Sequence, residues 1–270
     1  MSARWLDTPA QWASAAAVVR ASAAAGDPVG WDSETHGHDV TETTAPHRAR
    51  VHVWSLGVLT ATRHPRGHRV ASGAVFPLEA MMSGPLREAL EDPGVVKVAW
   101  NAPHDVHSAG NHGVTVRSAV DGLQRLRVLR PDLPRHGLKS VCSLVGRTLT
   151  PFETVLTMDE WHWAPGTCCA CEAPDHVWWC SPQKVGSLGE ERKGCRRRSD
   201  GHSRVACLLP KHGPRLQALE SVVPGHPLHP GLVTYSAEDA VTAVELDDWM
   251  SLQPNKAPPA MAWAPEWRTA

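Results

Sequence analysis

The sequence predicts a mixed α/β domain in which helices flank one sheet of five strands. Short apolar runs at hairpin spacing occupy the early part of the chain, which favours strands joined by turns. Helical periodicity then alternates with short strands, and it returns near the C-terminus after a stretch rich in cysteine. Strands that come first and later alternate with helices are typical of a mixed sheet with helices on its faces.

Each element follows from a local pattern. Trp5, Trp12, Ala16 and Val19 have the spacing of an amphipathic helix within residues 1–25. Apolar runs bounded by turn residues predict strands at Pro28–Glu34, Val51–Leu59, Arg69–Phe76, Val95–Trp100 and Gly113–Val116, the first three forming an antiparallel meander. Helical spacing, with proline and glycine at the expected ends, predicts helices at Leu78–Glu91, Asp121–Leu129, Leu138–Gly146 and Thr234–Met250, and regular structure at Pro214–Val223.

Composition excludes some classes of protein. Among 270 residues, 27 basic side chains balance 28 acidic ones, so no global positive field attracts nucleic acid, although a local patch stays open. No apolar run reaches the roughly 20 residues that span a bilayer, so no membrane partner is expected. Arg4, Asp7 and Arg20 interrupt the alanine-rich N-terminus, which therefore does not read as a signal peptide. We expect a cytoplasmic protein.

The composition shifts near the middle of the chain. Cysteine, tryptophan, proline, glycine and arginine dominate residues 161–213, and helical periodicity is lost there. Because a helical pattern resumes afterwards, we expect an insertion at 161–213 within a core formed by residues 1–160 and 214–250. Residues 251–270 are rich in proline and are expected to form an irregular tail.

The inserted segment has the composition of a zinc module. Six of the seven cysteines lie between Cys168 and Cys207, and in a reducing compartment such clustering favours a metal over disulfides. A C-x-x-C pair is half of many zinc sites, so the expected ligands are Cys168, Cys171, Cys195 and Cys207. Competing ligands are Cys180, His202 and His212, and reduced thiols without a metal are the alternative. Cys142, alone on a predicted helix, is expected in the core.

The candidate catalytic residues begin with Asp32 and Glu34, at the end of the first predicted strand. Side chains two positions apart on a strand point to the same face, so these carboxylates form a pair. Mg²⁺ takes oxygen ligands of this kind. An Asp-x-Glu sequence alone is also typical of a solvated loop, so the assignment depends on further motifs downstream.

Two further motifs follow in the expected structural contexts. Asn101-x-x-x-Asp105 comes directly after a predicted strand and starts a helix, where Pro103 is tolerated in the first turn. Tyr235-x-x-x-Asp239 places a tyrosine and an aspartate one turn apart on one helical face. Taken singly, Asn101 reads as a helix cap and the aspartates as surface acids. Only the combination of three motifs indicates a site.

The three motifs in this order resemble those of the DEDD 3′–5′ exonucleases, and the tyrosine in the third resembles the DEDDy branch, which includes RNase D and the proofreading domain of family A DNA polymerases. Asp121-Gly122-Leu123 and His136-Gly137-Leu138-Lys139-Ser140-Val141 also look like RNase D-type stretches. The resemblance covers Pro28 to about Leu149 and Pro214 to about Trp249. It implies an RNase H-like fold.

The resemblance also implies the roles of individual residues. Asp32, Glu34, Asp105 and Asp239 would hold two Mg²⁺ or Mn²⁺ ions, which a cluster of four repelling carboxylates needs for neutralisation. Two metals about 3.5–4 Å apart can activate water and stabilise both oxygens of an in-line displacement. Tyr235 would orient that water as a hydrogen-bonding phenol. Ser33 and Thr35 would bind the terminal nucleotide through the main chain, and Asn101 would either contact the substrate backbone or support the metal ligands from behind.

The implied partner is a nucleic acid with a free 3′ end, with DNA slightly preferred and RNA, as for RNase D, the alternative. Arg192–Arg198 contributes a basic run that could bind a phosphate backbone, and Trp178 and Trp179 could stack on bases, although a solvated face and packing are the plainer readings. A binding protein with an inactive nuclease fold is the rival from another class. A coincidental motif match in a zinc-binding interaction protein is the third, and it requires the carboxylates to lie far apart.

Overall fold

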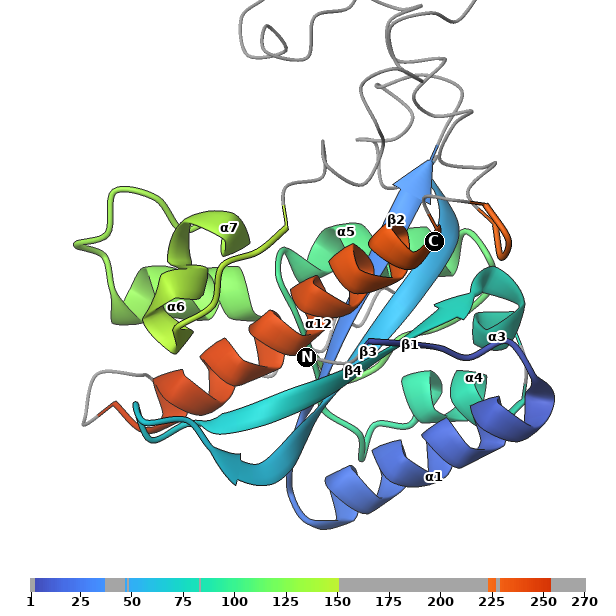
Figure 1. Cartoon of the computed structure of the whole chain (residues 1–270), viewed down its shortest axis with the longest axis horizontal. Helices are drawn as coiled ribbons and strands as arrows, with labels where there is room; N and C mark the ends of the chain where they lie inside the picture. Colours follow the sequence, from blue (N-terminus) through green and yellow to red (C-terminus); the bar gives the residue numbers. More distant parts are fainter. Residues whose placement is uncertain are drawn as a thin grey trace, which may run out of the picture. The chain divides into compact units, whose positions relative to one another are not determined.

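The computed structural model describes residues 3–36, 47, 49–82, 84–150, 223–226 and 229–253 (Figure 1). The chain divides into two units. One comprises Met1–Thr35, Arg50–Thr150 and Val233–Ala270, and the other comprises His36–Ala49 and Pro151–Leu232. All candidate residues of the acidic site lie in the first unit. Among the described helices, none combines the length and apolar character that crossing a bilayer requires.

The first unit is built on a mixed sheet of six strands in the order β1-β4-β3-β2-β5-β6. β3 and β4 are antiparallel, whereas β1 pairs with β4, β2 with β5 and β5 with β6 in parallel. The adjacency of β2, β3 and β4 agrees with the predicted meander. The strands are β1 (Arg4–Trp5), β2 (Val29–His36), β3 (Arg50–Arg63), β4 (Arg69–Pro77), β5 (Lys97–Ala99) and β6 (Ala119–Asp121).

The sheet differs from the predicted one at both edges. Trp5, expected in the first helix, belongs instead to β1, which is the additional sixth strand beside β4. The strand predicted at Gly113–Val116 does not form, and β6 at Ala119–Asp121 pairs with β5 in its place. Val114 is nevertheless 1% exposed, so the apolar pattern there reflects burial of a loop in the core and not strand pairing.

Helices occupy most of the predicted positions. The helix expected over Leu78–Glu91 is divided into two. Pro85 has no backbone N–H, so it cannot make the hydrogen bond that would continue the first helix. The helix expected over Leu138–Gly146 becomes one α-helical turn followed by a 3₁₀ turn. The helices are α1 (Pro9–Ala24), α3 (Leu78–Met82), α4 (Gly84–Glu91), α5 (Ala102–Gly110), α6 (Gly122–Leu129), α7 (Leu138–Val141), the 3₁₀ helix η1 (Cys142–Val145) and α12 (His229–Ser251).

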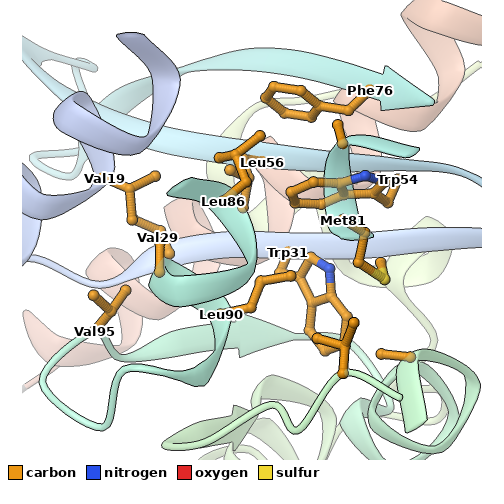
Figure 2. Packing of buried hydrophobic residues seen from close by; sticks show 14 of the residues in the cluster. Val19, Val29, Trp31, Trp54, Leu56, Phe76, Met81, Leu86, Leu90 and Val95 are labelled. Atoms are coloured by element: carbon orange, nitrogen blue, oxygen red, sulfur yellow. The ribbon is translucent and has the colours of Figure 1, made fainter. Parts of the chain in front are cut away.

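The main core lies between one face of the sheet and the helices α1, α3, α4 and α5. Figure 2 shows Val29 and Trp31 of β2 among the buried side chains, and Trp54 stacks on Phe76 with ring centroids 4.7 Å apart. A capping box between Thr8 and Gln11 starts α1 and satisfies two N–H groups at its end. Burial of these aromatic and aliphatic side chains holds the strand that carries the site.

Helix α12 packs on the opposite face of the sheet and crosses it obliquely (Figure 1). Three strands present glycines to it, and a Cβ added at Gly30 would lie 1.9 Å from the carbonyl oxygen of Ala240. Added Cβ atoms at Gly57 and Gly73 would also meet α12 at 2.8 Å and 2.9 Å. Because glycine has no Cβ, backbone can approach backbone here. This close approach sets the position of the residues along α12.

Cys142 is buried, as predicted for a core cysteine, and carries a free thiol. The other cysteines lie outside the described residues, as do the predicted insertion 161–213, the regular segment Pro214–Val223 up to residue 222, and the tail from residue 254. The domain boundaries and the zinc module therefore remain predictions from the sequence.

Candidate metal centre

Strand β2 presents its two carboxylates on the face that α12 covers. Gly30, Asp32 and Glu34 alternate with Trp31 and Ser33, so the first three share one face and the last two share the other. Trp31 is fully buried in the main core, which fixes the register of the strand. The same-face pair predicted from Asp-x-Glu is therefore present.

Helix α12 completes a group of three carboxylates. Asp32, Glu34 and Asp239 each offer one oxygen, and these oxygens all lie within 4.8 Å of one another. Asp239 immediately precedes Ala240, the residue whose carbonyl approaches Gly30 most closely. The glycine next to the motif thus allows the helix to bring its aspartate to the strand. A chance motif match would leave these carboxylates apart, and the structure contradicts that alternative.

Asp105, the fourth predicted carboxylate, is placed beside this group and not within it. It lies in the first turns of α5, is 3% exposed, and accepts hydrogen bonds through Oδ1 from the N–H of Ser33 at 3.1 Å and from its hydroxyl at 2.6 Å. Its negative charge raises the pKa of Asp32, Glu34 and Asp239. Asp105 therefore belongs electrostatically to the site while its orientation is set by Ser33.

The carboxylates hold unusually high pKa values. Burial is the largest cause for each of them, and mutual repulsion between their charges adds to it for Asp32, Glu34 and Asp239. The pKa of Glu34 is raised to about 8, that of Asp239 to about 7 and that of Asp105 to about 6. The pKa of Asp32 is raised well above its usual value. A cation bound among these carboxylates would favour their charged forms and lower these pKa values.

The site fits a hard divalent cation. Oε1 of Glu34 and Oδ1 of Asp239 are buried without a hydrogen-bond partner among the described residues. A buried carboxylate oxygen without a partner is costly. Mg²⁺ and Mn²⁺ take oxygen ligands, and the three converging carboxylates supply them. The donor set and the unpartnered oxygens both match such an ion.

Tyr235 lies one turn before Asp239 on α12, as predicted, and is largely buried. A hydrogen bond from Tyr235 lowers the pKa of Asp239. Lys139 approaches from α7, with Nζ 3.3 Å from the phenol oxygen and 4.8 Å from the centroid of the ring. Its positive charge lowers the pKa of Asp32, Glu34 and Asp239.

The predicted substrate-contacting residues have distinct surroundings. Asn101 is exposed and occupies the N-cap position of α5, but its side chain makes no capping bond and its backbone is left-handed, with φ 72°. The Asp121 carboxylate accepts a hydrogen bond from the backbone N–H of Asn101 at 3.2 Å and so holds this residue in place. Both hydrogen-bond donors of Ser33 are used by Asp105. Thr35 follows Glu34 on β2 and is partly buried.

Three features of the site were not predicted from the sequence: the approach of α12 over Gly30, the bond of Ser33 to Asp105, and the contact of Lys139 with Tyr235. Gly30 stands two residues before Asp32, and a glycine inside a strand is a signal for close backbone approach. Lys139 lies in a stretch that the resemblance had singled out without a role for it. The serine carried no signal of its own.

Solved nuclease structures are similar to this chain at low identity. The exonuclease domain of EXD2, soaked in Mn and GMP, is 17% identical with a TM-score of 0.34, and the match covers 58% of this chain and 76% of that one. NrnC of Brucella melitensis, bound to pGG, is 17% identical with a TM-score of 0.37, covering 82% and 84%. A nuclease in its apo form is 16% identical with a TM-score of 0.40, covering 94% and 99%.

Neither a protein-family model nor a curated protein matches the sequence. An exonuclease domain and a nuclease are thus among the solved structures similar to this chain. The mixed sheet flanked by helices is the fold class predicted from the sequence, with one strand more than expected. At these identities, the chemistry of the site rests on the chain's own residues.

Proposed function

We propose that this chain is a metal-dependent 3′–5′ exonuclease that hydrolyses phosphodiester bonds at the 3′ end of a nucleic acid and releases nucleoside monophosphates. The observation that carries the proposal is the convergence of Asp32, Glu34 and Asp239, whose oxygens lie within 4.8 Å of one another. These carboxylates come from two motifs more than 200 residues apart in the chain. Raised pKa values at each of them indicate a site built for a cation.

Two cations, Mg²⁺ or Mn²⁺, are the proposed cofactors. Asp32, Glu34 and Asp239 would hold one, and Asp32 with Asp105 would hold the other. When bound, the cations supply the positive charge that activates an attacking water and stabilises the oxygens of an in-line displacement at phosphorus. Ser33 keeps the Asp105 carboxylate oriented for this purpose through its two hydrogen bonds.

The remaining residues would bind the substrate and orient the attacking water. Tyr235, as in the DEDDy branch, would orient the attacking water through its phenol, because the side chain stands one turn from Asp239 on the same helix. Asn101, exposed beside Asp105, would contact the substrate backbone, and the main chain at Ser33 and Thr35 would contact the terminal nucleotide.

Residues 1–160 and 214–250 would form the exonuclease core, and residues 161–213 a structural zinc module held by Cys168, Cys171, Cys195 and Cys207. Reduced thiols that can bind zinc suit the cytoplasm, where we place the protein. The basic run Arg192–Arg198 of that module would contact the nucleic-acid backbone. DNA is the preferred substrate, and RNA the alternative.

Digestion of matched DNA and RNA single strands, labelled at the 5′ end, tests this function. With Mg²⁺ or Mn²⁺ we expect a ladder that shortens from the 3′ end, faster on DNA, and lost with EDTA. The Asp32→Asn/Glu34→Gln variant should give no ladder, while Ser14→Ala on α1 should cleave as the wild type does. A single internal cut, or a ladder that persists in the variant, contradicts the proposal. Failure of folded protein to cleave either strand favours the binding-protein alternative.

A further inference from the structure

Lys139 makes a contact to which the proposed chemistry assigns no role. It follows Leu138, the first residue of α7, and its ammonium reaches across to α12, where Nζ lies 3.3 Å from the phenol oxygen of Tyr235. The same ammonium lies 4.8 Å from the centroid of the phenol ring. One lysine therefore makes both a hydrogen bond and a cation–π contact with one tyrosine.

The position of Lys139 is fixed by its surroundings. Leu138 and Val141 of α7 belong to the same hydrophobic cluster as Leu246 and Met250 of α12, the helix that also carries Tyr235. The loop before α7 is tied to the sheet, because Trp100 donates its indole N–H to the carbonyl of His136 at 2.9 Å. The lysine and the tyrosine thus belong to elements that pack directly on each other.

The direction of this hydrogen bond constrains the phenol. An ammonium has only donors, so the phenol oxygen must act as the acceptor, and its single hydrogen must turn away from Nζ. Asp239 lies one turn further along α12, on the same face of the helix as Tyr235, so its carboxylate neighbours the phenol. Lys139 therefore limits where the phenol can donate its hydrogen, next to the proposed metal centre.

The geometry points to Lys139 as a positioning residue that acts through Tyr235 by fixing the direction in which the phenol donates its hydrogen. The inference rests on the proposed function for its effect on hydrolysis, but the contact itself does not. Without the ammonium, the phenol is no longer held in one orientation toward the attacking water that it is proposed to orient. The metal ligands remain in place, so the loss falls on the chemical step and not on substrate binding.

Tyr235 is the only tyrosine in the chain, so protein labelled with ¹³C-tyrosine reports its ring without overlap in NMR spectra. We expect Lys139→Met to shift the ring signals, Lys139→Arg to keep them close to the wild type, and Arg20→Met to leave them unchanged. Arg20→Met is a suitable control because it also removes one positive charge, here from an exposed ion pair between Arg20 of α1 and Glu88 of α4. Unshifted ring signals in folded Lys139→Met overturn the inference, whether or not the protein cleaves nucleic acid.

Kinetics of the same variants separate positioning from substrate binding. Lys139→Met should lower kcat by about tenfold, the loss expected of one hydrogen bond to a charged group, with KM for an oligonucleotide changed less than about twofold. Lys139→Arg should recover most of the rate. In a Tyr235→Phe background, Lys139→Met should have no further effect, because the group it acts through is absent. A raised KM with unchanged kcat, or the same tenfold loss without the phenol, shows that Lys139 acts on the substrate directly and overturns the inference.

Absence of cleavage by the wild type would refute the proposed exonuclease and leave the spectroscopic result standing. Shifted ring signals in Lys139→Met would then still establish the contact between Lys139 and the phenol. The two claims therefore fail separately.

Discussion

One carboxylate oxygen of Asp105 accepts two hydrogen bonds from Ser33, from the hydroxyl at 2.6 Å and from the backbone N–H at 3.1 Å. Asp105 belongs to α5 and Ser33 to β2, so the contact ties the helix to the strand between Asp32 and Glu34. Hydrogen bonds to a carboxylate favour its charged form. Ser33 thus orients Asp105 and favours its charged form, against the larger opposing effect of burial.

Removal of that hydroxyl should move the pH dependence of the site. Ser33 lowers the pKa of Asp105, which burial raises to about 6. Ser33→Ala should therefore raise this pKa, so that Mn²⁺-dependent cleavage rises at a higher pH than in the wild type and falls several-fold at pH 6.5. Ser108→Ala, which removes a buried hydroxyl from the same helix, is the control. An unchanged pH profile of the rate in Ser33→Ala would mean that the hydroxyl does not tune Asp105.

The stability of the metal-free protein should fall as the pH rises. Glu34 and Asp239 have pKa values of about 8 and about 7, against ordinary values of 4.5 and 3.8, so between about pH 4 and 8 the folded state binds more protons than the unfolded state. Stability then decreases with pH through that range. Urea unfolding in EDTA should show this decrease, and Mg²⁺ should offset it most at high pH. In Asp32→Asn/Glu34→Gln the decrease should be smaller, and an equal slope in both proteins would refute the pKa assignment.

Gly30→Ala should be strongly destabilising. The new Cβ would stand 1.9 Å from the carbonyl oxygen of Ala240, and backbone cannot give way as a flexible side chain does. We expect a loss of about 3 kcal/mol or more in the free energy of unfolding. Gly110→Ala, whose Cβ would meet nothing within 4 Å, should instead change stability by less than about 1 kcal/mol. Similar urea midpoints for the two variants would show that α12 does not press on β2 at this point.

Arg147→Met should destabilise the protein, because Arg147 forms a buried ion pair with Glu245 of α12. Glu245 is 2% exposed, bonds to Arg147 at 2.6 Å, and also accepts the backbone N–H of Ala71. Loss of the arginine leaves a buried charge without its partner, at a cost of about 3 kcal/mol. Adding Glu245→Gln should recover most of that loss, since a neutral amide still accepts the N–H. A double variant as unstable as the single one would contradict this explanation.

Much of the fold could be predicted from the spacing of apolar residues and from the proline and glycine residues that mark turns. The strands predicted near Asp32, Val51 and Arg69 agree with β2, β3 and β4 to within a few residues, because each is an apolar run bounded by turn residues. β1 could not be predicted, since a strand of two residues has no periodicity. β6 was misplaced because pairing with Lys97–Ala99, which the local sequence does not encode, decides where it forms.

The site was predictable to the extent that its motifs are local. Asp32 with Glu34, and Tyr235 with Asp239, have spacings that strand and helix geometry convert into shared faces. The hydrogen bond of Ser33 to Asp105 joins residues 72 positions apart, and the contact of Lys139 with Tyr235 joins residues 96 apart. Such contacts depend on how β2, α5, α7 and α12 pack, which no local spacing records.

The most direct test of the metal centre is anomalous scattering from crystals of the whole chain soaked in Mn²⁺. We predict a manganese peak in contact with carboxylate oxygens of Asp32, Glu34 and Asp239, and a second peak beside Asp32 and Asp105. The peak at the three carboxylates should disappear in Asp239→Asn crystals. Manganese bound only elsewhere, with these three carboxylates left without a cation in well-ordered density, would contradict the assignment of this site as the centre of a metal-dependent nuclease.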